Sequence, residues 1–285
     1  MLIYFAATVL LGALLAPILY WGGQFLAEHG IFPALGKFDF ETFFHRALLL
    51  AAVILLWPLL RSIEARTPGA VGLRPNPKWR SHLVVGFLIS VVPLLCCGAT
   101  LLLLHLFRVR MAITGRSLVT ILLTTVAVPL IEEGLFRGLV LGILLRSSRV
   151  GVSVFLTSAF YSIVHFLKAP DRTSATVSWT SGFNSIAHSF AQFGDPMLVA
   201  EGFTTLFLVG WILADARLRT SSLWLPIGLH AGWIFGNGVF NKFAHQQRIL
   251  APWLGKNLLV GIIPLFIVGL TWVIMRGWLR WNVKT

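Results

Sequence analysis

The sequence carries little charge for its length. Only 12% of its 285 residues are Asp, Glu, Lys or Arg, about half the usual share for a soluble domain, whereas 57% are hydrophobic and the mean hydropathy is +0.84. A chain this poor in charge excludes a soluble enzyme and a disordered tail. The only cysteines are the neighbours Cys96 and Cys97, and because adjacent cysteines rarely pair, a disulfide-stabilised secreted module is excluded as well.

A long polar linker is also missing. Apolar runs recur from Met1 almost to Thr285, so residues 1–285 are predicted to form a single integral-membrane domain. A spanning helix needs about 20 mostly apolar residues. The pattern predicts an all-α polytopic membrane protein of about eight transmembrane helices around a polar cavity. The predicted spans are residues 3–20, 47–60, 82–106, 118–145, 150–167, 202–213, 223–240 and 258–275.

One connection, residues 168–201, has a helical pattern of its own. Phe183, Ile186, Phe190 and Phe193 recur at nearly helical spacing. This spacing predicts a short helix on the bilayer surface, and an ordinary loop is the alternative.

Acidic residues are few. The chain has 10 Asp and Glu against 23 Lys and Arg, which gives a net charge of +13. The basic residues sit singly or in small groups beside apolar runs, as in proteins that anchor helix ends at anionic lipid. We therefore expect the lipid bilayer, and no nucleic acid, as a partner. The compact length and the lack of sorting signals favour a multi-pass protein of a bacterial inner membrane.

Three of the apolar segments contain ionisable side chains, which are functional-site hypotheses by default inside a membrane. Residues 131–138 read Ile-Glu-Glu-Gly-Leu-Phe-Arg-Gly, residues 161–166 read Tyr-Ser-Ile-Val-His-Phe, and residues 230–234 read His-Ala-Gly-Trp-Ile. Either histidine alone would usually be a hydrogen-bonded core residue. Two histidines and a glutamate pair across three apolar helices favour a shared site.

Helical geometry separates the two glutamates. At about 100° per residue, Arg137 lies some 40° from Glu133 but about 140° from Glu132. Glu133 and Arg137 also have the favourable i,i+4 order for an ion pair. The spacing therefore predicts that Glu133 supports the structure and that Glu132, without a local counter-charge, takes part in chemistry.

These motifs resemble the CPBP family of intramembrane endopeptidases, which includes CAAX proteases of the Rce1-like type and bacteriocin-processing enzymes. The resemblance rests on the EExxxR element from Glu132 to Arg137, the aromatic-xxx-His element from Tyr161 to His165, and His230. It covers residues 118–240, the expected catalytic core.

The resemblance implies an endopeptidase that hydrolyses a peptide bond of a membrane-anchored protein. It implies that Glu132 and His165 activate a water and that His230, with an Asn or Asp four residues later, holds the oxyanion. Two positions depart from the family pattern, because Tyr161 replaces Phe and Ile234 replaces the Asn or Asp. Asn237, on the same helix face, is expected to substitute only if the helix is bent or unwound.

Three other interpretations remain open. A zinc-dependent hydrolase would use Glu132, Glu133, His165 and His230 as ligands, although the chain has no HExxH motif. No cofactor is our first expectation. Because Ile234 removes an oxyanion donor, a catalytically inactive scaffold or immunity-type protein of the same fold is the second alternative. A proton-coupled transporter is the third, and the lack of an internal repeat argues against it.

Overall fold

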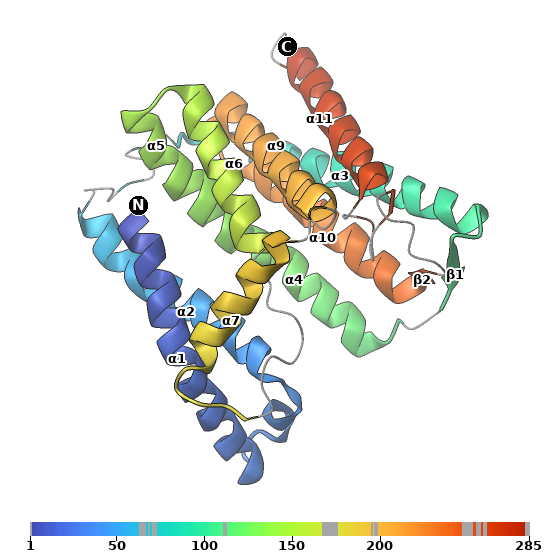
Figure 1. The fold of residues 1–285 in the computed structure, drawn as a ribbon. Coiled ribbons are helices and arrows are strands. Elements are labelled where there is room, and N and C mark those ends of the chain that lie inside the picture. The colour runs from blue at the N-terminus through green and yellow to red at the C-terminus, as the bar shows by residue number, and fades with distance from the viewer. Residues whose placement is uncertain are drawn as a thin grey trace. The chain divides into compact units, whose positions relative to one another are not determined.

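The computed structural model describes residues 2–62, 73–110, 113–166, 176–194, 199–246 and 261–282, with the single residues 67, 69, 196, 253, 254 and 258. The protein is an all-α polytopic membrane protein, as predicted (Figure 1). All eight predicted spans overlap helices. Among the described residues, five helical segments are long and apolar enough to cross a membrane, and Val150–His165 is a shorter apolar helix. The five are Ile3–Glu28, Phe40–Leu59, Trp79–Leu103, Gly115–Ser147 and Ile262–Asn282.

The chain divides into two compact units, Met1–Arg66 with Phe166–Asp195, and Thr67–His165 with Pro196–Thr285. The single domain 1–285 and the catalytic core 118–240 stay predictions, and residues 166–195 of that core belong to the first unit.

The first unit is built on two long helices, α1 (Leu2–Glu28) and α2 (Phe40–Ser62), joined by the 3₁₀ helix η1 (Pro33–Lys37). Asp39 precedes α2, and its Oδ1 accepts hydrogen bonds from the Thr42 backbone N–H at 3.0 Å and the Thr42 hydroxyl at 2.7 Å. The Thr42 side-chain hydrogen bond holds the pKa of Asp39 below its ordinary value of 3.8. Asp39 is therefore the N-cap of α2.

The helix predicted in the long connection is present as α7 (Ser181–Ala191), which is followed by the short 3₁₀ helix η4 (Gln192–Gly194). A stripe of Ser181, Ser185 and Ser189 is buried, whereas Phe183 and Phe190 are exposed. The Ser185 hydroxyl donates to Glu41 at 2.9 Å. The aromatic face of α7 thus points outward, and its small polar face packs inward.

The second unit contains the remaining elements. They are α3 (Trp79–Leu103), α4 (Gly115–Glu133), the π-helical segment η3 (Gly134–Val140), α5 (Leu141–Ser147), α6 (Val150–Phe166), the π-helical turn η5 (Val199–Phe203), α9 (Thr204–Thr220), α10 (Trp224–Phe243) and α11 (Ile262–Asn282). Two short strands, β1 (Phe107–Val109) and β2 (Ala244–Gln246), pair antiparallel. The last predicted span began at residue 258, but α11 begins at Ile262, so that Pro264 falls in its first turn, where a missing N–H is tolerated.

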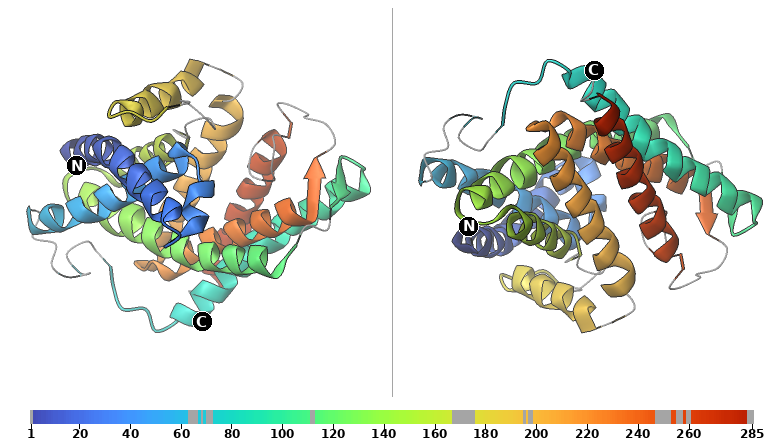
Figure 2. Two further views of the ribbon diagram at one scale, coloured as in Figure 1. Left: turned by 90° about the horizontal axis from the view of Figure 1, so that it is seen from below. Right: turned by 90° about the horizontal axis from the view of Figure 1, so that it is seen from above.

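Within this unit α10 packs closely on α3, and α11 also lies along α3 (Figure 2). Glycines make the α3–α10 approach possible, since a Cβ on Gly86 would lie 2.8 Å from the Leu225 carbonyl oxygen. A Cβ on Gly232 would meet the Ser90 hydroxyl and would lie 2.5 Å from the Phe87 carbonyl oxygen. Small residues at such contacts let helix backbones approach directly.

Candidate active site

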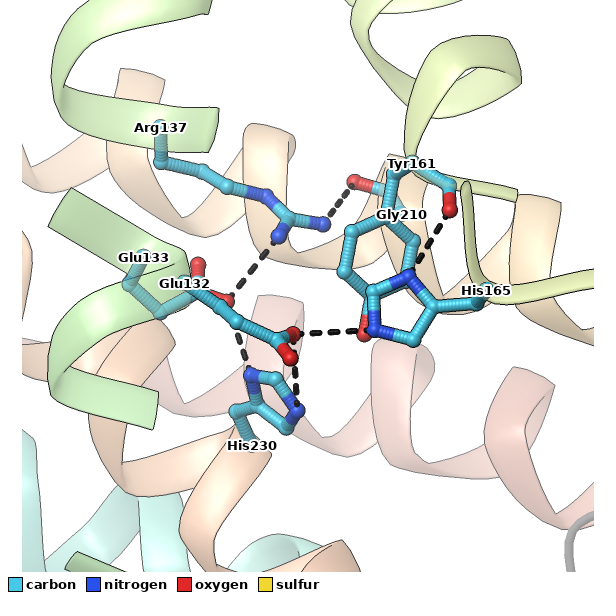
Figure 3. Close-up of polar contacts among 7 residues, drawn as sticks. All are labelled: Glu132, Glu133, Arg137, Tyr161, His165, Gly210 and His230. Atoms are coloured by element: carbon cyan, nitrogen blue, oxygen red, sulfur yellow. Dashed lines mark hydrogen bonds and ion pairs between the residues drawn. The ribbon is translucent and has the colours of Figure 1, made fainter. Parts of the chain in front are cut away.

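The two glutamates lie at the C-terminal end of α4, where the helix changes its hydrogen-bond pattern. Glu132 and Glu133 are its last residues, and the π-helical segment Gly134–Val140 follows without a break. Single π-helical turns inside α-helices occur frequently at functional sites. Three other helices, α6, α9 and α10, bring Tyr161, His165, Gly210 and His230 to this point (Figure 3).

Glu133 and Arg137 form the ion pair that their spacing predicts. The Arg137 Nη1 donates to Glu133 Oε1 at 2.9 Å, and neither side chain has any exposed surface. Arg137 Nη2 also donates to the Gly210 carbonyl oxygen of α9 at 3.1 Å. The guanidinium lies 4.3 Å from the centre of the Tyr161 ring. Arg137 therefore connects α4, α6 and α9, and removing it would leave a buried carboxylate without its counter-ion.

Glu132 points away from this pair and contacts a different helix. Its Oε2 lies 3.0 Å from Nε2 of His165 on α6. The Glu132 side chain is 20% exposed and that of His165 is 25% exposed, in contrast to the fully buried Glu133. The two glutamates thus occupy different environments, and only Glu132 can be reached from outside the protein.

Hydrogen-bond chemistry fixes the proton on His165. Its Nδ1 lies 2.8 Å from the Tyr161 backbone carbonyl oxygen, which can only accept, so Nδ1 carries a hydrogen. A neutral His165 would then offer Nε2 as an acceptor toward the Glu132 carboxylate, and two acceptors cannot bond to each other. One further proton is therefore shared between His165 Nε2 and Glu132 Oε2.

His230 joins both glutamates, which the spacing within α4 could not reveal. Its Nδ1 donates to Glu133 Oε1 at 2.8 Å, and its Nε2 lies 3.8 Å from Glu132 Oε2. Glu133 Oε1 consequently accepts from both Arg137 and His230. This contact joins residues 97 positions apart in the chain, and it directs Nε2 of His230 toward Glu132.

Tyr161 supports the site through its ring. The ring is 2% exposed, and its centre lies 4.0 Å from that of the His165 imidazole with 34° between the planes. An aromatic side chain at this position therefore fixes the orientation of His165. Gly210, which accepts from Arg137 through its backbone, was not among the predicted residues, because a carbonyl oxygen leaves no signature in a sequence.

Asn237 is the one predicted residue that the structure does not bring to the others. Residues 224–243 form one continuous α-helix, so Asn237 lies two turns, about 10 Å, beyond His230. The unwinding that could have joined the two is therefore absent from α10. Ile234 stands on α10 one turn beyond His230 and has no donor to offer.

The dependence on zinc stays a prediction. In the described part of the chain, no group of three or more His, Cys, Asp or Glu side chains is placed to hold a metal ion. Glu133 Oε1 already accepts from Arg137 and His230, so this oxygen would have to leave both partners to serve as a metal ligand.

Residues 114–236 match the family model described as type II CAAX prenyl endopeptidase Rce1-like. The matched segment is similar to an Rce1-like domain, and the resemblance drawn from the motifs is thereby confirmed over residues 114–236. No curated protein and no solved structure matches the chain.

The Rce1-like match encloses every residue of the site. It begins at Thr114, the N-cap of α4, and ends one residue before Asn237. Glu132, His165 and His230 therefore lie inside the matched segment, and the helices α1, α2, α3 and α11 lie outside it.

Proposed function

We propose that this Rce1-like protein hydrolyses a peptide bond of a membrane-associated protein with a water activated by Glu132 and His165. The contact between these two residues carries the proposal, because it places an ionisable pair, in part exposed, among otherwise buried groups. A general base within hydrogen-bond reach of water is the first requirement of peptide hydrolysis. The CAAX-type family makes a lipid-anchored peptide the first substrate class to test.

The proposed reaction depends on the proton shared by the pair. Glu132 accepts a proton from water, and the water oxygen forms a bond to the carbonyl carbon of the substrate. The carbon–nitrogen bond then breaks, and the departing amine takes a proton from the Glu132–His165 pair. The Tyr161 carbonyl keeps Nδ1 of His165 protonated and directs Nε2 toward Glu132 throughout.

His230 is proposed to stabilise the oxyanion. For Nε2 to donate a hydrogen bond it must carry a hydrogen, so His230 acts as an imidazolium, since its Nδ1–H is held by Glu133. Glu133 Oε1 also accepts from Arg137, so the developing oxyanion supplies the negative charge that balances the imidazolium. A donor directed at the developing oxyanion contributes about 100- to 1,000-fold in rate.

The test uses the protein in liposomes with two internally quenched peptides. One peptide carries a farnesylated cysteine three residues from its C-terminus, and the other is an unlipidated transmembrane peptide. We expect Glu132→Gln and His165→Ala to lower kcat by about 100- to 10,000-fold while thermal unfolding stays close to wild type. Full activity in Glu132→Gln would refute the general-base role.

A chelator separates the metal-dependent alternative. Because Glu133 is held by Arg137 and His230, we propose hydrolysis without zinc, and cleavage should survive dialysis against a chelator. Loss of cleavage that added zinc restores would favour the alternative ligand set Glu132, Glu133, His165 and His230.

Ile234 supports a second candidate function. A protein that keeps the fold but lacks the second oxyanion donor would bind membrane peptides without cutting them, as a scaffold or immunity-type protein. Capture of peptides by the Glu132→Ala protein, followed by incubation with wild type, distinguishes the two. Peptides that wild type binds but leaves intact would favour the scaffold. We further propose the bacterial inner membrane as the location.

A further inference from the structure

Helices α4 and α10 run antiparallel in the second unit, and two contacts define the region between them. At one end Gly238 faces Ile121, since a Cβ on Gly238 would lie 3.4 Å from the Ile121 side chain. At the other end His230 donates to Glu133. We call the stretch between these two contacts the α4–α10 seam.

Three residues of the seam hold buried polar atoms that lack partners. Thr125 Oγ1, Trp233 Nε1 and Asn237 Oδ1 have no hydrogen-bond partner among the described residues. Thr125 is 8% exposed and Trp233 is 2% exposed. Buried polar groups are normally bonded, and each exception requires an explanation. Together the three offer a donor, an acceptor and a hydroxyl that serves as either.

The backbone of α4 adds a further acceptor to the seam. Pro129 lies inside the helix and has no N–H, so the Thr125 carbonyl four residues earlier lacks its usual helical donor. At about 100° per residue, Asn237 lies about 20° and Trp233 about 60° around α10 from His230. On α4, Thr125 lies about 20° from Glu132. The unpartnered groups therefore lie on the sides of the two helices that continue from the site.

The packing indicates which of the two helices can move. Helix α4 packs along α10 and has only sparse contacts with other helices in the part of the chain that the structure describes. By contrast, α10 is fixed to α3, where Gly86, Gly228 and Gly232 bring the backbones together. At the far end of the seam, Gly238 presents no side chain to hold Ile121. Separation of the seam is thus a displacement of α4 from an α10 that stays on α3.

We propose that the seam opens to admit the substrate and that Thr125, Trp233 and Asn237 bind its extended backbone beside the scissile bond, an inference that rests on the proposed peptidase function. Every peptide residue brings one N–H and one C=O, which match the donors and acceptors of the seam. The two turns from His230 to Asn237 span about 10 Å, the length of about three extended residues. Trp233 donates to a peptide carbonyl, and Asn237 Oδ1 accepts from a peptide N–H.

A disulfide across the seam tests the opening directly. The Gly238 Cβ position lies 3.9 Å from the Ile121 Cβ, within the range that a disulfide requires. The variant Ile121→Cys/Gly238→Cys is made in a Cys96→Ala/Cys97→Ala background and placed in liposomes with the farnesylated peptide. We expect cleavage to fall at least 20-fold on oxidation and to return on reduction. The cysteine-free parent, oxidised alike, is the control, and an oxidised variant that cuts at the reduced rate overturns the proposal.

A second measurement does not depend on the reaction. Thr125→Val and Asn237→Leu, made in the Glu132→Ala protein, should each weaken binding of the fluorescent farnesylated peptide by about 5- to 30-fold. In the active protein the same changes should raise KM and leave kcat within about twofold. The matched control is Thr124→Val, because this exposed neighbour donates to carbonyls of its own helix.

Each outcome separates the inference from the proposed function. Unchanged binding and unchanged KM in both seam variants would overturn the inference, and the unpartnered atoms would then serve bound water alone. If the seam variants lose binding but the wild-type protein never cuts the peptide, the inference stands and the proposed peptidase function is refuted.

Discussion

Replacing Arg137 with Met should strongly destabilise the protein, because the guanidinium is the buried counter-ion of Glu133. Neither side chain has exposed surface, and Arg137 also supplies a hydrogen bond to Gly210. Breaking a buried pair by removing one partner costs about 3–5 kcal/mol. At about 2 °C for each kcal/mol in a chain of this size, the unfolding temperature should fall by about 6–10 °C.

A second ion pair of the chain is a matched control. Arg219 and Asp215 are also four residues apart and 2.9 Å from each other, but Arg219 is 39% exposed. Exposed pairs contribute about 0–1 kcal/mol, so Arg219→Met should lower the unfolding temperature by about 2 °C or less. Thermal unfolding in detergent, followed by tryptophan fluorescence, compares the two variants under identical conditions.

A double variant that also changes Glu133, the partner of Arg137, completes a double-mutant cycle. Glu133→Gln/Arg137→Met removes both charges, so the double variant should lose less stability than the sum of the single changes. Strict additivity, or an Arg137→Met protein as stable as Arg219→Met, would refute the assignment of a coupled buried pair.

Three further predictions concern other parts of the molecule. Gly232→Ala should lower stability by about 1–3 kcal/mol, measured by thermal unfolding, because its methyl group would meet the Phe87 carbonyl oxygen. Ile234→Asn should raise kcat by about 10- to 100-fold in the peptide assay if a second oxyanion donor is the missing element, and no change would refute this. Asp39→Ala should cost about 1 kcal/mol at pH 7 in denaturant titrations, because it removes the cap of α2. Since the folded pKa of Asp39 is lowered, its contribution is present above pH 3.8 and is lost as the pH falls through the folded pKa, so variant and wild type should converge there.

The sequence predicted the helices well, because membrane spans are set by length and apolar composition. The α7 helix was also expected, but its orientation was not. Phe183 and Phe190 face outward and the serines face inward, since the surroundings of a membrane protein are themselves apolar. Helical periodicity therefore identifies the two faces of such a helix and leaves open which one packs on the protein.

Within the site, the spacing of neighbouring residues predicted one ion pair correctly, whereas the contacts between distant parts of the chain could not be predicted. The pairing of Glu133 with Arg137 follows from one turn of helix and is present. The hydrogen bond from His230 to the same carboxylate depends on how α10 packs on α4, which no single-sequence pattern encodes. The motif order led to the family, and on the continuous helix of α10 Asn237 lies about 10 Å along the axis from His230.

The π-helical segment Gly134–Val140 marks where the helix holds one residue more than a regular α-helix needs. A π-helical turn accommodates that residue by widening. Deleting one residue of the segment while it relaxes to a regular α-helix would therefore leave the rotation of α4 relative to α5 nearly unchanged. Deleting a residue from the regular helix on either side would instead rotate the glutamates by about 100° relative to α5. Relatives with the same site should thus carry any one-residue gap of this helix within residues 134–140.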